Sequence, residues 1–157
     1  MSARKSLSWL GSVLVLALVA SLGTSVSSAR EATRLTGLRG EQLTDSDLAG
    51  GATVLVVWAS WSPRCRDIVE RVNPLAERWS GKARVGTVNF QEDRAAVEAF
   101  LRGKSLSTPV YLDADGAFSK RNAVTTLPGL LVYVDGQVAY SGRLPEDPDS
   151  LLSKTLR

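Results

Sequence analysis

The chain has 157 residues, 44% hydrophobic and 22% charged, which fits one globular domain with a proper core. Its formal net charge is +3, but two of the basic residues, Arg4 and Lys5, lie in an N-terminal segment that contains no acid. Without these two, the chain has 17 basic and 16 acidic residues, a net charge of +1. This balance favours neither nucleic acid nor an anionic membrane as the partner.

The lack of histidine, together with a single cysteine, excludes several kinds of active site. No Ser-His or Cys-His catalytic pair can form. A zinc site built on His and Cys is equally impossible, and so is haem ligation by His. Cys65 has no second cysteine with which to form a disulfide. We therefore expect no metal and no cofactor, and a fold that depends on its core.

Residues 1–29 have the features of a secretory signal peptide: a basic start, a mostly apolar stretch at 7–22 and a possible cleavage site at Ser27-Ser28-Ala29. An uncleaved membrane anchor is the alternative, but the short apolar stretch and its serine-rich end favour cleavage. In either case we expect residues 30–157 to form a single extracytoplasmic domain, periplasmic or secreted. It would contact the membrane only if the segment stays uncleaved.

A polar lead-in at 30–53 shows only weak local signals. The apolar run Val54–Trp58 follows, and its valine content predicts a buried strand. Residues 64–72 are expected to form a helix with Pro63 in its first turn. This arrangement would bring Cys65 to a helix N-terminus, where backbone N–H groups and the helix dipole favour a thiolate.

Strands and helices alternate along the rest of the chain. In order, we expect a kinked or restarted helix at 75–79 after Pro74, a strand at 83–90, an amphipathic helix at 93–102, a strand at 108–112, a brief helical stretch up to 124, a hairpin of strands 130–134 and 137–140, and a terminal helix at 147–156. Asp135-Gly136 suits a type I′ hairpin turn. The acidic residues at 113–116 lack the other ligands of a calcium loop and indicate a plain turn. Right-handed crossovers would place helices on both faces of one mixed sheet, an α/β fold.

Trp58-Ala59-Ser60-Trp61-Ser62-Pro63-Arg64-Cys65 resembles the W-A-S-W-C-P-x-C signature of thioredoxin-fold proteins, in the form found in extracytoplasmic TlpA/ResA-type thiol-disulfide oxidoreductases. Segments 88–93 and 111–116 resemble the insertion typical of that family, and Thr126-Leu127-Pro128-Gly129 resembles its cis-proline loop. The resemblance covers roughly residues 35–157 and rests on several motifs in the same order. It implies a thioredoxin fold, a central mixed sheet flanked by helices, with the TlpA-like inserted helix and strand.

Three positions depart from the family pattern. Ser62 stands where the family has its nucleophilic cysteine, Val56 where thioredoxins keep a buried acid, and Gly129 where a threonine usually follows the proline. Because a serine hydroxyl is a poor nucleophile toward sulfur, the catalytic positions implied by the resemblance are Cys65 and a degenerate Ser62. Ordinary dithiol turnover is then predicted to be lost.

The sequence leaves three interpretations of Cys65 open. The first is a buried, inert thiol behind Ser62. The second is a monothiol that forms mixed disulfides, assisted by Arg64 and Arg66 if the sulfur is exposed. The third, ranked last, is a peroxidase of the T-x-x-C type, which is disfavoured because Trp58 replaces the proline that precedes that motif.

Family members bind an extended partner peptide against the backbone of the residue before the cis-proline. The resemblance therefore implies a substrate-binding surface formed by Trp61, Pro63, Leu127 and Pro128. We expect Trp61 to be exposed and Trp58 to pack in the core.

Two functions follow from these observations. The first is an atypical extracytoplasmic thiol-disulfide oxidoreductase that acts through Cys65 on a thiol or disulfide of a partner protein or peptide. The second is a redox-inactive module that binds a partner peptide or protein at the Trp61/Pro128 surface.

Overall fold

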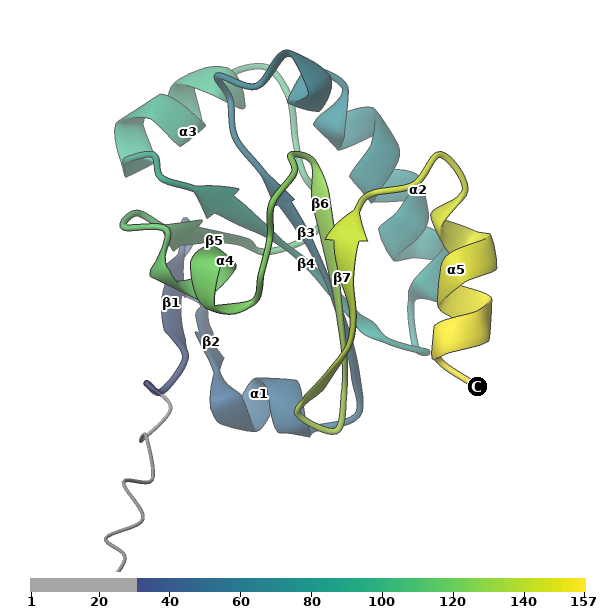
Figure 1. The fold of residues 1–157 in the computed structure, drawn as a ribbon. Helices are drawn as coiled ribbons and strands as arrows, with labels where there is room; N and C mark the ends of the chain where they lie inside the picture. The colour runs from purple at the N-terminus through teal and green to yellow at the C-terminus, as the bar shows by residue number, and fades with distance from the viewer. Residues whose placement is uncertain (1–30) are drawn as a thin grey trace, which may run out of the picture. The chain divides into compact units, whose positions relative to one another are not determined.

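The structure is a computed structural model that describes residues 31–157, so the expected signal segment at 1–29 lies outside the described residues. One mixed sheet of seven strands has the order β2-β1-β5-β4-β3-β6-β7 (Figure 1). The strands are β1 (Arg34–Gly37), β2 (Gln42–Thr44), β3 (Ala52–Trp58), β4 (Arg84–Phe90), β5 (Val110–Asp113), β6 (Gly129–Val134) and β7 (Gln137–Arg143). The helices are α1 (Asp45–Ala49), α2 (Ile68–Trp79), α3 (Arg94–Phe100), α4 (Ala117–Arg121) and α5 (Pro148–Thr155), with a 3₁₀ turn, η1, at Pro63–Cys65.

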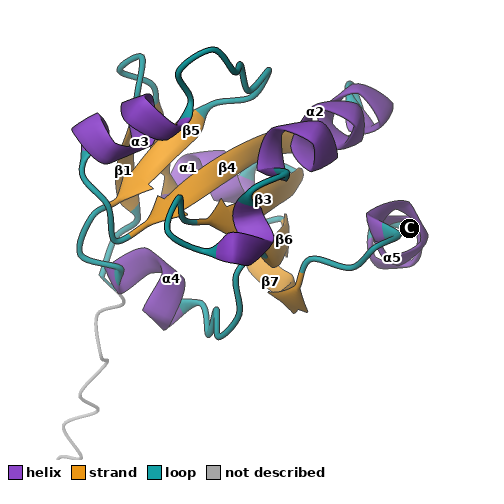
Figure 2. Cartoon of the chain, turned by 90° about the horizontal axis from the view of Figure 1, so that it is seen from above, coloured by secondary structure: helices purple, strands orange, loops and turns teal. Residues whose placement is uncertain are grey.

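The predicted central strand is confirmed as β3, which pairs in parallel with β4 and antiparallel with β6. Its side chains alternate between two apolar clusters. Val54, Val56 and Trp58 pack with residues of α2, α3 and α5, whereas Leu55 and Val57 pack with residues of α1 and α4. Figure 2 shows α3 and α4 on opposite sides of the sheet. A strand covered on both faces requires an unbroken apolar run, and this is why its sequence does not alternate.

The predicted hairpin and terminal helix are also confirmed. Asp135 and Gly136 have φ angles of 48° and 80°, the left-handed conformations that a type I′ turn requires. The side chain of Asp147 caps α5 by accepting a hydrogen bond from the backbone N–H of Ser150 (3.1 Å), and Pro148 occupies the first turn. In the region described, no helix is both long and apolar enough to cross a membrane.

The chain after the motif differs from the expectation. η1 is only a short 3₁₀ turn, and α2 begins at Ile68 rather than at residue 64. The helix then continues through Pro74 instead of restarting there. A proline inside a helix costs about 3 kcal/mol or more. Here the apolar side chains before and after it pack into the same cluster on the sheet, so tertiary burial holds the helix together. These residues are Ile68, Val72, Leu75 and Trp79.

The lead-in that the sequence left unassigned contains regular structure. β1 pairs with β2 and with β5, so this segment extends the sheet by a hairpin. Leu43 is fully buried and Leu48 is 3% exposed, which anchors the segment to the core. Thr44 and Asp47 form a capping box at the start of α1: the Thr44 side chain accepts from the Asp47 N–H, and Asp47 accepts from the Thr44 N–H.

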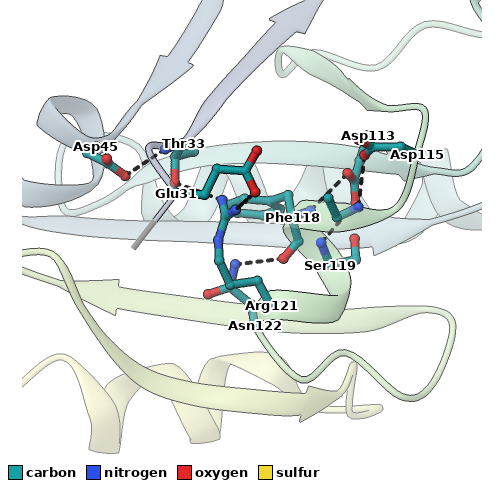
Figure 3. A network of polar contacts seen from close by, with 10 residues as sticks. Glu31, Thr33, Asp45, Asp113, Asp115, Phe118, Ser119, Arg121 and Asn122 are labelled. Atoms are coloured by element: carbon teal, nitrogen blue, oxygen red, sulfur yellow. Dashed lines mark hydrogen bonds and ion pairs between the residues drawn. The ribbon is translucent and has the colours of Figure 1, made fainter. Parts of the chain in front are cut away.

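The acidic residues at 113–116 form the turn between β5 and α4. The buried carboxylate of Asp113 accepts hydrogen bonds from the N–H groups of Phe118 (3.1 Å) and Ser119 (2.9 Å), and Asp115 accepts from Ala117 (2.9 Å) (Figure 3). The two carboxylates therefore satisfy backbone donors in the first turn of α4.

We predict that Leu43→Ala lowers the free energy of unfolding by about 2–5 kcal/mol, because it removes a fully buried side chain from the cluster under α1. Leu35→Ala, in the paired strand and only half-buried, is the control and should cost less. Urea unfolding followed by circular dichroism measures both. Equal losses would mean that the lead-in hairpin is not anchored through Leu43.

Candidate functional site

The Ser62–Cys65 segment follows the end of β3 and turns back onto the face of the sheet covered by α2. Ser62 is 6% exposed and Cys65 is completely buried. The Cys65 N–H donates to the Ser62 carbonyl oxygen at 2.9 Å, which closes the 3₁₀ turn. The Cys65 side chain belongs to the same apolar cluster as Val56 and Ile68. The sulfur therefore lies inside the core.

Burial raises the pKa of the Cys65 thiol above its usual value. The pKa is lowered by hydrogen bonds from the Ala59 backbone and the Ser62 hydroxyl and by the nearby charge of Arg71, but the effect of burial is larger. The negative charge of Asp67 raises the pKa further. The expected support from a helix N-terminus is weak, because α2 begins only at Ile68. The thiol form is favoured, so the exposed thiolate that a monothiol mechanism needs is not present in this conformation.

Both tryptophans of the motif have the exposure that was expected. Trp58 is fully buried, and its ring packs against Phe100 with a centroid distance of 5.2 Å. Trp61 is 60% exposed.

A groove of about 480 Å³ lies beside the motif. Its lining residues come from η1, α2, the loop before β6 and the segment after β7: Pro63, Arg64, Arg66, Asp67, Arg71, Leu127, Pro128, Arg143, Leu144 and Glu146. The Leu127–Pro128 peptide bond is cis. Within residues 31–157 the backbone N–H and C=O groups of Leu127 have no hydrogen-bond partner, so they are free to pair with a bound chain.

The structure brings together three of the predicted substrate-binding residues, Pro63, Leu127 and Pro128. Trp61, the fourth predicted residue, is exposed on the motif loop but is not among the residues that line this groove, so its part in binding stays a prediction. Ser62 and Cys65 do not line it either, since both are buried. The surface that could hold a partner is therefore separate from the sulfur.

Gly129 explains one departure from the family pattern. A Cβ atom at this position would lie 2.9 Å from the Thr126 carbonyl oxygen and 2.9 Å from Cγ1 of Val124. A side chain such as threonine would therefore collide with the backbone of its own loop. The chain needs glycine here to keep the Thr126–Pro128 loop against β6.

The sequence analysis missed Glu92, which fixes the loop between β3 and η1. Its Oε2 accepts hydrogen bonds from the Ser60 N–H (2.7 Å) and from Nδ2 of Asn89 (2.7 Å), and its Oε1 accepts from the Ser60 hydroxyl. Glu92 thus ties the loop that carries Trp61 and Ser62 to the end of β4. The only local signal was an acid soon after a strand that neighbours the motif.

Comparison with known proteins places this arrangement in a family. Residues 17–156 match the Redoxin family. The chain belongs to the Redoxin family. This redoxin is 26% identical over 83 residues to the sporulation thiol-disulfide oxidoreductase A of Bacillus subtilis, a match that covers 50% of each chain. It is 34% identical over 91 residues to the thiol:disulfide interchange protein DsbE of Yersinia pestis, covering 56% of this chain and 45% of the relative. The matches thus span about half the length of these curated relatives.

Solved structures with the same fold include a thiol:disulfide interchange protein DsbE described for Chlorobium tepidum, at a TM-score of 0.69 and 23% identity, covering 80% of this chain and 94% of that one. StoA from Bacillus subtilis matches at a TM-score of 0.65 and 22% identity, covering 79% and 96%. The thioredoxin fold and the family expected from the sequence are therefore confirmed for the redoxin.

Replacing Glu92 should loosen the Ser60 loop. Because hydrogen bonds to a charged group contribute about 1.5–3 kcal/mol, we expect Glu92→Ala to lower the free energy of unfolding by about 2 kcal/mol and to speed amide exchange at Ser60. Glu98→Gln on α3, which removes one exposed ion pair, is the control and should change neither quantity measurably. Unchanged exchange at Ser60 in Glu92→Ala would contradict the positioning role.

The raised pKa of Cys65 should make stability depend on alkaline pH. Below the usual pKa of 9.0 both folded and unfolded states keep the thiol proton; above it the unfolded thiol ionises first, so stability falls as pH rises toward the folded-state pKa. The fall should reach at most about 1.4 kcal/mol per pH unit. Cys65→Ala lacks this term, so its stability difference from wild type should shrink above pH 9 in denaturant titrations. A constant difference across that range would contradict the prediction.

Proposed function

We propose that this redoxin is an extracytoplasmic thioredoxin-fold module that binds an extended segment of a partner protein and has lost ordinary dithiol chemistry. The observation that carries the proposal is the complete burial of Cys65, with a raised thiol pKa, behind a serine at the nucleophile position. Two-cysteine turnover needs an accessible attacking thiolate and a resolving thiol. Here Ser62 replaces the first, and the second is enclosed in the core.

The groove supports the binding part of the proposal. Leu127 offers an unpaired N–H and C=O next to Pro128, and an extended chain can pair with such groups as an added strand. Pro63 lines the same groove. None of these contacts needs a reactive sulfur, so binding survives the loss of the first cysteine.

A monothiol oxidoreductase is the second candidate, and two observations favour it: the thiol-disulfide oxidoreductases among the relatives, and the Arg71 charge that acts on Cys65. In this mechanism the Cys65 thiolate attacks a partner disulfide, forms one mixed S–S bond and releases the partner's other sulfur as a thiolate. The chain has no second cysteine to break that bond, so an external thiol would have to complete the cycle. The core around the sulfur would also have to open.

The extracytoplasmic location is proposed from residues 1–29, which have the pattern of a signal peptide. A structural neighbour from Mycobacterium tuberculosis is described as a secreted disulfide oxidoreductase, which supports the same placement. A membrane contact would follow only if this segment remains uncleaved.

Thiol accessibility and insulin reduction together test the proposal. We expect Cys65 to react with a maleimide only on unfolding, and wild type not to accelerate the reduction of insulin beyond the rate with dithiothreitol alone. Fast labelling of the folded protein with an apparent pKa below the usual value of 9.0 would instead support the monothiol enzyme.

Ser62→Cys should restore partial insulin reduction. The introduced thiolate would attack the insulin disulfide, Cys65 would then resolve the mixed disulfide, and dithiothreitol would reduce the resulting disulfide. Recovery should be partial, because Ser62 is only 6% exposed. Ser62→Ala is the matched control and should stay inactive. Robust reduction by wild type would overturn the argument from Ser62.

A further inference from the structure

Four arginines converge on the groove from separate parts of the fold. Arg64 comes from η1, Arg66 from the loop after it, Arg71 from α2 and Arg143 from the end of β7. The described domain has no excess of positive charge to explain this. With Arg4, Lys5 and Arg30 outside it, residues 31–157 contain 16 basic and 16 acidic residues. The basic character is therefore local to the groove.

These four arginines are not engaged with acidic side chains. Across residues 31–157 none of them forms an ion pair within 4.0 Å, whereas Arg78, Arg84, Arg94 and Arg121 each do. The acids Asp67 and Glu146 line the groove too, which leaves a net charge of +2 among the lining residues.

The guanidinium of Arg71 has a defined position. Its Nη2 donates to the carbonyl oxygens of Leu144 (3.3 Å) and Pro145 (3.2 Å). Arg71 is half-buried, whereas Arg64, Arg66 and Arg143 are exposed and free to reach a ligand. Arginine is suited to this role because its planar fork binds a carboxylate through two parallel hydrogen bonds.

We propose that the groove binds an extended acidic segment of a partner protein, with spaced carboxylates on Arg64, Arg66 and Arg143 and its backbone on Leu127. This rests on the proposed function, and it adds the chemistry of the partner. The presence of Asp67 and Glu146 in the same lining favours spaced acids over a continuous acidic run, because a carboxylate placed beside either of them would be repelled.

The size of the effect follows from the exposure of the groove. An exposed ion pair contributes about 0.2–1 kcal/mol, so three of them should favour an acidic segment over its neutral counterpart by roughly tenfold. Salt should reduce that preference, since the Debye length falls from about 10 Å at 0.1 M to about 3 Å at 1 M ionic strength.

Fluorescence anisotropy with labelled peptides tests the proposal on the intact domain. The probes are a peptide that alternates valine with glutamate and the same peptide with glutamine in place of glutamate. We expect the acidic peptide to bind roughly tenfold tighter at low salt, and the advantage to shrink at high salt. Arg64→Gln, Arg66→Gln and Arg143→Gln should each weaken the acidic peptide about twofold and affect the neutral one less, so that each lowers the ratio of the two affinities.

Arg102→Gln is the matched control, since Arg102 is exposed and does not line the groove, and it should bind both peptides like wild type. Equal affinity for the two peptides would overturn the acidic preference but leave the peptide-binding module standing. Absence of binding by either peptide would overturn both. Binding to anionic phosphatidylserine vesicles that the Arg→Gln substitutions abolish, with no peptide binding, would identify a membrane surface and also overturn the proposal.

Discussion

The burial of β3 on both faces is the constraint on which the rest of the structure depends. Val54, Val56 and Trp58 must face the layer of α2, and the chain leaves the strand at Trp58 on that side. The following turn then folds back over the same layer and places the Cys65 side chain in the apolar cluster. Burial of the sulfur is thus a consequence of how the central strand packs, and burial is also the main cause of its raised pKa.

Two local contacts fix the surface beside that turn. Glu92 holds Ser60 through a bidentate set of hydrogen bonds, which ties the motif loop to β4. In the loop with the cis-proline, Gly129 lies close to the backbone of its own loop, at a distance that a Cβ atom would not allow. The groove is lined by η1, α2, the cis-proline loop and the end of β7, so its shape depends on how these elements pack rather than on a reactive group.

Strong local signals made much of the fold predictable from the sequence. The unbroken apolar run predicts β3, the Asp-Gly pair predicts the hairpin turn, and Asp147 followed by Pro148 predicts the start of α5. The sequence predictions failed where tertiary contacts determine the local structure. β1 and β2 are too short to show a pattern, and α2 continues through Pro74 because the sheet holds both halves. At the site, the sequence motifs indicated Ser62, Cys65 and the cis-proline loop as candidates. They could not show that Arg143 and Arg71 line the same groove, since only the packed fold brings the end of β7 and α2 to one surface.

The residues at positions 56 and 62, which both depart from the family pattern, are physically consistent with each other. An acid at position 56 would lie fully buried in the cluster that contains Cys65, where an ionised carboxylate is costly without a partner. In a two-cysteine mechanism, an acid at this position would have a function that offsets this cost, because it would transfer protons for the resolving thiol. In the proposed module, with Ser62 at the position of the attacking thiol, no resolution step remains, and Val56 contributes only to the packing of the core. Apart from Ser62, the side of the motif that faces the core can then be apolar, while the polar and charged groups that could select a partner lie on the groove outside it.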